Sequence, residues 1–531
     1  MTGDKVYSFG PFAIDVTARL LSVNHKQVDL GSRAFEILVA LIERRGEIVS
    51  KQDLLARAWP NVHIEEHNLR VHVAALRRAL GEEGQRLLIN VPGRGYSFVG
   101  DVALSSKPAR TAVSGADSAS GLLVTNEDNQ HRIRTAPITP SIRIGIIHSL
   151  TGPMAQSEGP ISDATLMAVH EINQAGGILG GRLIEPLLVD GESDELCFSA
   201  KAQELITNEK VSALFGCLTS ASRKQVKAIV EQNNHLLLYP MQYEGLEQSP
   251  NIFYLGAAPN QQLLPAVRWI FAFLQRRRFF LVGWDSIYSH ACNAILRDEI
   301  QALGGTVVGE EYIHVAGMEI PTVVEKLVDA NSDIILNSIV GDMNAPFCRA
   351  LRSMRIRGPT VPMVYLSISE NELKGISKID AAGDYGVFSY FQNLDRPENR
   401  AFVTSFQNRY GKQRVTSDPM EAAYSGVYLW AQAVNSAGTC DDISAVRRAL
   451  RRQAFNAPGG SVVIDPENQH AWKIVRIAEI TKNGDFSITW SSENPIRPEP
   501  YPPSRSVERW HALLDTTSTR WNGRWSRPDL V

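Results

Sequence analysis

Short apolar segments alternate with segments of helical length from Ile142 onward, and this alternation constrains the fold more than any other feature of the chain. The apolar segments are 142–147, 187–189, 211–215, 236–238, 280–282 and 334–336. Strands that alternate with helices build parallel sheets. Roughly 360 residues share the pattern, which exceeds one comfortable hydrophobic core. The sequence therefore predicts an α/β unit of two lobes with parallel sheets and a cleft between the lobes.

Polar and aromatic side chains follow two of these segments, at the points where parallel strands would end. Ser220 follows one segment, and Tyr239, Gln242 and Tyr243 follow the next. Ligands bind beyond the carboxyl ends of strands in open α/β sheets. A hydroxyl at a helix N-terminus and flat rings with polar tips suit a compact, polar, planar guest. We expect these four residues to form one wall of a small-molecule pocket.

The second lobe is expected to supply the opposite wall. Asp285, Tyr288 and Asp342 follow its strands, and Glu158 lies after the first strand of the other lobe. Carboxylates accept hydrogen bonds from an NH₂ group, while hydroxyl and backbone N–H groups donate to a carbonyl, so an uncharged guest can use both. A plainer interpretation stays open, because a tyrosine at a strand end is often core and an aspartate there often caps a helix.

Residues 1 to about 102 follow a different pattern, in which short strands precede and follow three helices. Ser32 and Ser50 are expected to cap the first two helices, and the third is expected over 65–80. A turn of sequence PGRG places Arg94 at the tip of a terminal hairpin. The predicted strands are 9–15, 20–23, 28–30, 87–91 and 96–99. This arrangement predicts an α+β winged helix.

The predicted third helix has one apolar face and one small, basic face. Leu69, Val73, Leu76 and Leu80 recur at helical spacing. The outward face carries His67, Arg70, Val71, Ala74 and Arg78. Such a face is typical of a DNA-contacting helix and also of an ordinary solvated helix, so the surrounding pattern must decide between them.

Four segments resemble the OmpR-type effector domain: GSRAF (31–35), NLRVHV (68–73), LRRAL (76–80) and GRGY (93–96). The resemblance implies that the third helix enters the major groove of duplex DNA and that the hairpin is the wing. Ala74 and Ala75 stand where many relatives carry long basic side chains, which favours thymine-methyl contact or shape readout. For His72, a packing role and a DNA-backbone contact both stay open. The expected DNA contacts are His67, Asn68, Arg70, His72, Arg77, Arg78 and Arg94.

The region from about 142 to 500 resembles the substrate-binding component of urea and short-chain amide transporters and the amide sensor of amidase operons, which share a type 1 periplasmic-binding-protein fold. The resemblance implies a urea-like or short amide guest and binding roles for Ser220, Tyr239 and Asp342. Leu218 and Ser286 depart from the family pattern and favour a larger or more weakly bound guest. The matching segments include 216–224, 238–245, 247–254, 256–261, 418–424, 464–470 and 490–493.

Composition divides the chain further. Residues 103–140 are rich in Ser, Ala, Thr and Pro without apolar periodicity and predict a flexible linker. The sensor is then expected at 141–500, followed by a C-terminal extension at 501–531. OmpR-type domains usually follow a receiver domain, and none is found before this one, so we expect the input signal to come from the C-terminal side.

The whole-chain composition predicts a cytoplasmic protein without membrane attachment. Hydrophobic residues make up 44% of the chain and charged residues 21%, and the formal net charge is −3. The five cysteines are scattered without a CxxC pair, which favours free thiols in a reducing compartment. No signal-like N-terminus and no run of about 18 apolar residues is present in the sequence.

The sequence contains no GxSxG, HExxH, phosphate-loop or dinucleotide-binding motif, so we expect no catalytic residue, no metal and no cofactor. The predicted function is a one-component transcription regulator, expected to be a homodimer, that binds promoter DNA and senses a small polar molecule. A ligand-free dimerisation or interaction module stays open as an alternative, and an amide-processing enzyme is the weaker one.

Overall fold

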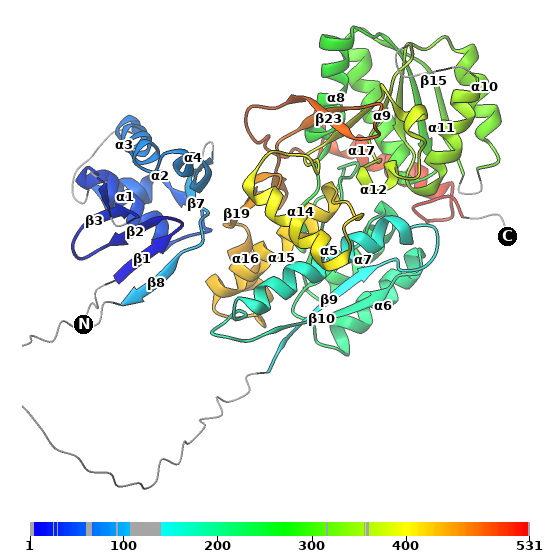
Figure 1. The fold of residues 1–531 in the computed structure, drawn as a ribbon. Coiled ribbons are helices and arrows are strands. Elements are labelled where there is room, and N and C mark those ends of the chain that lie inside the picture. Colours follow the sequence, from blue (N-terminus) through cyan, green and yellow to red (C-terminus); the bar gives the residue numbers. More distant parts are fainter. Residues whose placement is uncertain are drawn as a thin grey trace, which may run out of the picture. The chain divides into compact units, whose positions relative to one another are not determined.

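The computed structural model describes residues 5–106 and 140–528, apart from 25, 29, 60–65, 92–93, 315–316, 355 and 357–359. The chain forms two compact units, residues 1–140 and 141–531, each described here by itself (Figure 1). Most of the expected linker, 107–139, lies outside the described residues. Strand β8 (Ala103–Ser106) pairs with β1 (Lys5–Phe9), so the first unit extends beyond the boundary expected at residue 102.

The first unit contains two antiparallel sheets and four helices. One sheet has the order β4-β3-β2-β1-β8, and the other has the order β5-β7-β6. The remaining strands are β2 (Phe12–Asp15), β3 (Leu20–Val23), β4 (Lys26–Val28), β5 (Val49–Ser50), β6 (Leu88–Val91) and β7 (Gly95–Phe98). The helices are α1 (Ser32–Glu43), α2 (Lys51–Ala58), α3 (Glu66–Ala79) and α4 (Glu82–Leu87). The predicted winged helix is confirmed, while the short helix α4 had no expected counterpart.

Local sequence explains how these helices begin. The Ser50 hydroxyl accepts a hydrogen bond from the Asp53 N–H at 3.0 Å, so it caps α2 as expected. Ser32 is not a cap, because it is already the first residue of α1 and Gly31 precedes the helix without a side-chain hydrogen bond. Gly95 opens the wing strand β7 with φ 144°, and a Cβ there would lie 2.0 Å from the Val49 carbonyl oxygen. Only glycine lets the two strands approach so closely.

The second unit has two lobes, each built around its own sheet. The lobe 1 sheet is parallel with the order β10-β9-β11-β12-β13. Its strands are β9 (Ile142–His148), β10 (Ile184–Asp190), β11 (Leu214–Gly216), β12 (Leu237–Tyr239) and β13 (Ile252–Tyr254). Its helices are α5 (Ala155–Gln174), α6 (Glu195–Thr207), α7 (Ser220–Gln232), α14 (Pro397–Tyr410), α15 (Asp418–Ala437) and α16 (Ile443–Leu450), and a small antiparallel sheet adds β19 (Ala454–Ala457), β20 (Gly460–Ile464) and β21 (Ala471–Trp472).

Lobe 2 is built on the sheet β15-β14-β16-β17-β18-β22-β23, whose last two strands run antiparallel to their neighbours. Its strands are β14 (Arg278–Trp284), β15 (Thr306–Ile313), β16 (Ile334–Ser338), β17 (Met363–Tyr365), β18 (Tyr385–Phe388), β22 (Arg476–Ile480) and β23 (Phe486–Ser491). Its helices are α8 (Leu263–Trp269), α9 (Ile287–Ala302), α10 (Ile320–Asp329), α11 (Asn344–Ser353), α12 (Glu370–Leu373), α13 (Lys378–Ala381) and α17 (Val507–Thr519), with short helices η1 (Pro259–Gln261), η2 (Ile270–Leu274) and η3 (Gly341–Met343).

The chain crosses between the lobes three times. The buried cores of the two lobes exchange residues between 255 and 263, between 391 and 402, and between 471 and 475. As a result, α15 packs on α5 although the two helices are far apart in sequence (Figure 1). The expected two-lobed fold with parallel sheets is confirmed, and the three crossings form the hinge between its lobes.

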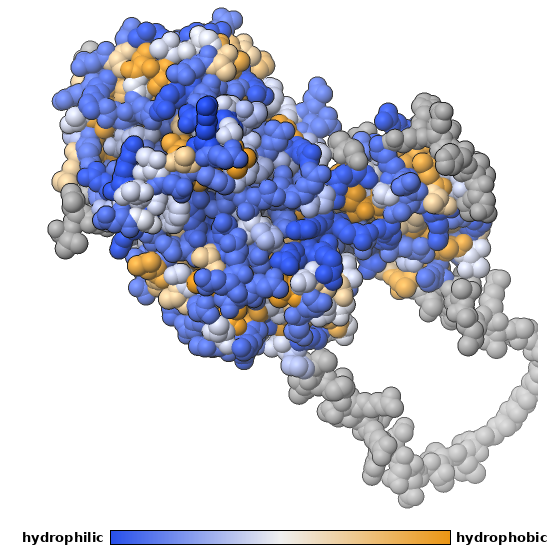
Figure 2. All heavy atoms as spheres, turned by 180° about the vertical axis from the view of Figure 1, so that it is seen from behind, coloured by the Kyte–Doolittle hydropathy of each residue, from blue (hydrophilic) through white to orange (hydrophobic). Residues whose placement is uncertain are grey.

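The expected C-terminal extension is part of lobe 2. Trp510 of α17 is completely buried in the lobe 2 core, and its indole N–H donates to the Pro502 carbonyl at 2.9 Å. On the face seen in Figure 2, hydrophilic residues predominate and hydrophobic residues gather in small, separate patches. Among the described residues, no helix is both long and apolar enough to cross a membrane.

Candidate functional site

A cavity of about 40 Å³ lies between the two lobes. Since about 10–15 Å³ of such space holds one water molecule, the cavity accommodates a guest of only a few heavy atoms. Lobe 1 contributes Ser157, Leu218, Thr219, Ser220, Ala221, Met241 and Gln242 to its lining. Lobe 2 contributes Trp284, Ser286, Ile287, Tyr288, Val340, Gly341, Ser367, Glu372 and Ser526. We call this space the inner cavity.

The N-terminus of α7 forms the lobe 1 wall. Gly216 ends β11 with φ 136°, and a Cβ there would lie 2.0 Å from the Ile147 carbonyl oxygen, so glycine is needed at this strand end. Thr219 caps α7, because its hydroxyl accepts from the Ser222 N–H at 3.0 Å. The N–H groups of Ser220 and Ala221 lie in the first helical turn and therefore have no intrahelical acceptor. They are available to a carbonyl oxygen in the cavity.

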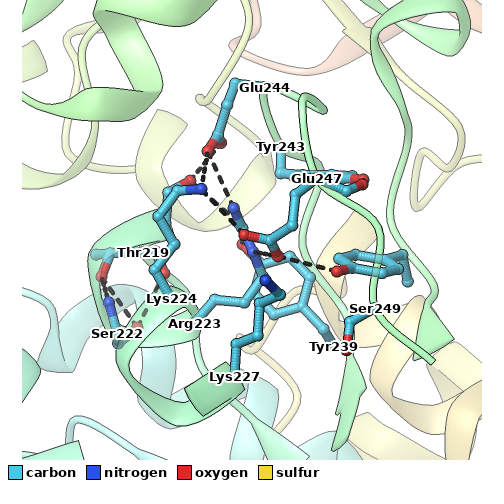
Figure 3. A network of polar contacts seen from close by, with 12 residues as sticks. Thr219, Ser222, Arg223, Lys224, Lys227, Tyr239, Tyr243, Glu244, Glu247 and Ser249 are labelled. Carbon is cyan, nitrogen blue, oxygen red and sulfur yellow. Dashed lines mark hydrogen bonds and ion pairs between the residues drawn. The ribbon is translucent and has the colours of Figure 1, made fainter. Parts of the chain in front are cut away.

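Ser220 links this wall to a buried ionic cluster (Figure 3). Its hydroxyl donates to Glu244 and accepts from Arg223 Nη1 at 3.1 Å. Arg223 also contacts Glu244 through Nη2 and Glu247 through Nε, both at 3.0 Å. Lys224 Nζ lies 3.0 Å from Glu247. Since Arg223 and Glu244 are completely buried, this pairing holds the start of α7 in place.

The charges of the cluster keep one another ionised. Burial opposes the charged form of Glu247, but the positive charges of Arg223 and Lys224 outweigh it and hold the pKa of this carboxyl far below its usual range. Burial acts against the charge of Arg223 as well, yet Glu247 and Glu244 raise its pKa. The cluster is therefore a fixed structural element with no proton to exchange near neutral pH.

Tyr239 and Tyr243 pack behind the wall and do not line the inner cavity, which corrects their expected role. The Tyr239 hydroxyl donates to the Leu218 carbonyl at 2.7 Å, and its ring lies 4.9 Å from the Arg223 guanidinium. The Tyr243 hydroxyl bonds His470, and its ring stacks on Tyr254 at 5.0 Å. Both rings are buried core, as the plainer interpretation of a tyrosine at a strand end had it.

Gln242 and Ser286 present hydrogen-bonding atoms without partners to the inner cavity. Gln242 Nε2 donates to the Leu366 carbonyl at 3.2 Å, while Gln242 Oε1 has no partner among the described residues. The same holds for Ser286 Oγ. Both side chains are buried, so their unpaired atoms need a guest or a water to satisfy them. Gln242 was expected here, whereas Ser286 had been noted only as a departure from the family pattern.

Tyr288 and Glu372 provide the polar edge of lobe 2. Tyr288 lines the inner cavity as expected, and its hydroxyl accepts from Ser367 Oγ at 3.2 Å. Burial raises the pKa of Tyr288, so the phenol stays neutral. Glu372 is the carboxylate of the lining and accepts from the Ser369 N–H at 3.1 Å and hydroxyl at 2.6 Å. The sequence offered no local signal for Glu372, because it lies inside the short helix α12.

Three expected carboxylates lie outside the inner cavity. Asp342 is exposed in η3, since its backbone turns the side chain to solvent. Asp285 accepts from His290 at 2.8 Å and pairs with Arg527 at 3.4 Å, so its oxygens are engaged elsewhere. Glu158 is buried and accepts from the Ser149 N–H at 2.9 Å; it lines a neighbouring cavity. The sequence identified strand ends correctly but not the direction of these side chains.

In the first unit, α3 has the expected two faces. Leu69, Val73, Leu76 and Leu80 are buried. The side chains of Arg70, Val71, Ala74 and Arg78 are exposed. An apolar patch of one valine between two arginines gives this face both a charge and a methyl-rich surface.

Other expected DNA contacts differ in their surroundings. Arg77 Nη2 donates to the Leu88 carbonyl at 2.7 Å, so Arg77 ties α3 to strand β6. The His72 ring lies 5.2 Å from that of Trp59, which favours its packing role. Arg94 is partly exposed at the wing. The side chains of His67 and Asn68 lie outside the described residues.

The described residues contain no group of three or more His, Cys, Asp or Glu that could hold a metal ion. A winged helix joined to a two-lobed unit with an interlobe cavity defines a transcription-regulator DNA-binding domain fused to a binding-protein-like domain. The chain belongs to the periplasmic binding protein domain family, whose model matches residues 142–507. The model for the C-terminal domain of transcriptional regulatory proteins matches residues 25–98.

Curated relatives match either part of the chain. A Leu/Ile/Val-binding protein homolog of Brucella suis is 22% identical over 65% of this chain and 88% of that protein. Limonene hydroxylase of Geobacillus stearothermophilus is 39% identical over 23% of this chain and 22% of that protein. The transcriptional regulator HilA of Salmonella typhimurium is 35% identical over 20% of this chain and 19% of that protein. The chain thus spans under a quarter of the last two relatives, whose whole-protein activities do not transfer to it.

Solved structures support the fold of the second unit. A solute-binding protein of an ABC transporter from R. palustris, in complex with 4-hydroxybenzoate, aligns with a TM-score of 0.61 and 20% identity over 67% of this chain and 98% of that chain. At this level of identity the likeness establishes the fold alone. The urea or amide specificity expected from the sequence stays a prediction.

Proposed function

We propose that this protein is a one-component, cytoplasmic transcription regulator that binds promoter DNA through its winged helix and senses urea, a short-chain amide or a similar small, uncharged molecule between its lobes. The observation that carries the ligand assignment is the pair of unpaired atoms, Gln242 Oε1 and Ser286 Oγ, in a buried cavity. A buried polar group without a partner costs about 1–3 kcal/mol, which a fitting guest recovers.

The chemistry of the lining favours an amide. The N–H groups at the start of α7 and the Ser286 hydroxyl donate to a carbonyl oxygen, whereas Gln242 Oε1 accepts from an NH₂ group. The lining contains Glu372 and no lysine or arginine, so a carboxylate guest of the kind held by the R. palustris protein would have no counter-ion. The volume of about 40 Å³ further favours a guest of few atoms.

Exposed groups of α3 support the DNA-binding role. Arg70 and Arg78 would contact phosphates, and Arg94 would contact the backbone from the wing. Val71 is 49% exposed and would pack on a thymine methyl group in the major groove. A homodimer would present two such helices to adjacent half-sites, and ligand-driven lobe closure would change their spacing.

The test is calorimetric titration of the full chain with acetamide and urea, together with binding to a duplex selected by the protein from a random pool. We expect acetamide or urea to bind and to change DNA affinity. Ser286→Ala removes one hydrogen bond to the guest and should weaken ligand binding by about 1 kcal/mol, roughly fivefold in Kd. Ser353→Ala, on the exposed end of α11, is the matched control and should leave Kd unchanged.

The opposite results are equally clear. If the full chain binds DNA but no small amide, the ligand assignment fails and the ligand-free interaction module is favoured. If a ligand binds and DNA affinity does not move, the second unit is not a sensor for the first.

A further inference from the structure

The segment 524–527, which we call the strap, enters the cleft after α17 and pairs with the lobe 2 wall. Ser526 forms an isolated antiparallel bridge with Ser286. The Ile287 N–H donates to the Trp525 carbonyl at 2.9 Å, and the Arg527 N–H donates to the Asp285 carbonyl at 3.1 Å. The strap thus adds one short extended strand to the loop that carries Ser286.

The same segment also contacts lobe 1. Lys224 Nζ lies 4.9 Å from the centre of the Trp525 ring, a cation–π contact with the ionic cluster behind α7. Burial raises the pKa of Glu195 at the start of α6, and the Trp525 N–H and Arg524 charge oppose that shift, so both lie close to this carboxyl. The strap therefore joins the two lobes across the mouth of the cleft.

Ser526 stands between two cavities. It lines the inner cavity, and it also lines an outer cavity of about 290 Å³ together with Glu158, Glu195, Arg524 and Arg527. Thr219, Ala221 and Trp284 are shared by the two linings, so the cavities are neighbours. The inner cavity is small because the strap occupies the space between them.

We propose that the strap determines ligand size: Ser526 is a wall of the ligand site, and the strap excludes guests larger than a short amide while it holds the lobes together. This proposal rests on the ligand-sensing function above. Its energetic basis is modest, since two backbone hydrogen bonds, one half-exposed ion pair and one cation–π contact hold the strap. A segment held so lightly can leave the cleft without unfolding either lobe.

The test uses a chain that ends at Gly523, which keeps the buried Trp521 in lobe 2. The probes are acetamide and benzamide, which share the amide group and differ in bulk. If the strap leaves the cleft in about 1–10% of intact molecules, its removal should improve benzamide affinity roughly 10- to 100-fold. Acetamide should bind the shortened chain more weakly, because one wall is lost. Unchanged affinities, or the same change for both amides, would overturn the proposal.

A second readout needs no ligand. Hydrogen exchange at 218–221 in lobe 1 should become faster in the shortened chain, although the strap makes its backbone hydrogen bonds only to lobe 2. Unchanged exchange there would mean that the strap does not hold the lobes and would overturn the proposal. If neither amide binds either chain, the ligand assignment has failed on its own, and the exchange result decides about the strap.

A point variant provides the matched comparison. Arg527→Ala removes the ion pair with Asp285 and should shift both readouts in the direction of the shortened chain, by a smaller amount. Arg520→Ala changes an exposed arginine just upstream of the strap and should shift neither. Equal behaviour of the two variants would contradict a role of the Arg527 contact.

Discussion

The two walls of the cleft differ in how completely their polar groups are paired. In lobe 1, Arg223 contacts Glu244 and Glu247 at 3.0 Å each and also bonds Ser220. In lobe 2, Ser286 Oγ has no partner among the described residues, and the loop that carries it is held by the strap. One wall is thus fixed by buried charges, whereas the other has capacity left for a guest.

This difference teaches that pairing, and not residue type, decides which side chains are available to a ligand. Tyr239 and Tyr288 both follow strand ends and both are buried. The Tyr239 hydroxyl donates to a carbonyl behind the wall, whereas Tyr288 reaches the inner cavity. The same residue type serves packing in one lobe and lining in the other.

The largest test of the comparison is Arg223→Met, which keeps much of the side-chain volume and removes the charge. Glu244 and Glu247 would then be buried without their main partner, and we expect the second unit to lose about 3–5 kcal/mol of unfolding free energy. Guanidinium denaturation of the full chain measures it. Arg400→Ala breaks an exposed ion pair with Asp395 and should cost about 0–1 kcal/mol. Equal losses would contradict the fixed character of the lobe 1 wall.

A pH titration tests the same wall through His470. Burial lowers its pKa to about 4, from a usual value near 6.5. Between these values the unfolded chain binds a proton that the folded chain excludes, so stability is present above pH 6.5 and falls toward pH 4. The slope from this group is at most about 1.4 kcal/mol per pH unit.

The control for this titration is His470→Phe, which keeps a ring stacked on Tyr254, 4.2 Å away in the native pair. Its unfolding free energy should depend less steeply on pH between 6.5 and 4, by about one proton. His235 is also buried with a lowered pKa, so a residual slope of the same sign is expected in both chains. An unchanged slope in the variant would mean that His470 is already protonated in the folded state.

The sequence was sufficient for the parts of the fold that repeat a local pattern. Apolar segments near 142–147 and 334–336 became β9 and β16, and the apolar face of α3 was identified residue by residue. The site was harder, because the direction of a side chain in a loop depends on backbone turns. Asp342 and Gly341 are neighbours in η3, yet only Gly341 lines the inner cavity.

The strap was beyond reach for a different reason. Ser286 and Ser526 are far apart in sequence, and their pairing is a single bridge without alternating apolar residues. Nothing local distinguishes Trp525 from other tryptophans near a chain end. Contacts of this kind follow from the packing of α17 against lobe 2, which brings the end of the chain to the cleft.

The smallest expected effect carries the comparison into the first unit, where adjacent arginines differ in pairing. Arg77 bonds the Leu88 carbonyl, so Arg77→Ala should destabilise this unit by about 1–2 kcal/mol. Arg78 is exposed, and Arg78→Ala should change stability by no more than about 0.5 kcal/mol. Its effect should instead appear in DNA binding, where the salt dependence of log K falls by about 0.9 per lost phosphate contact. Hydrogen exchange of β6 and DNA retention at several salt concentrations separate the two, and a reversed outcome would show that pairing does not predict role in this domain.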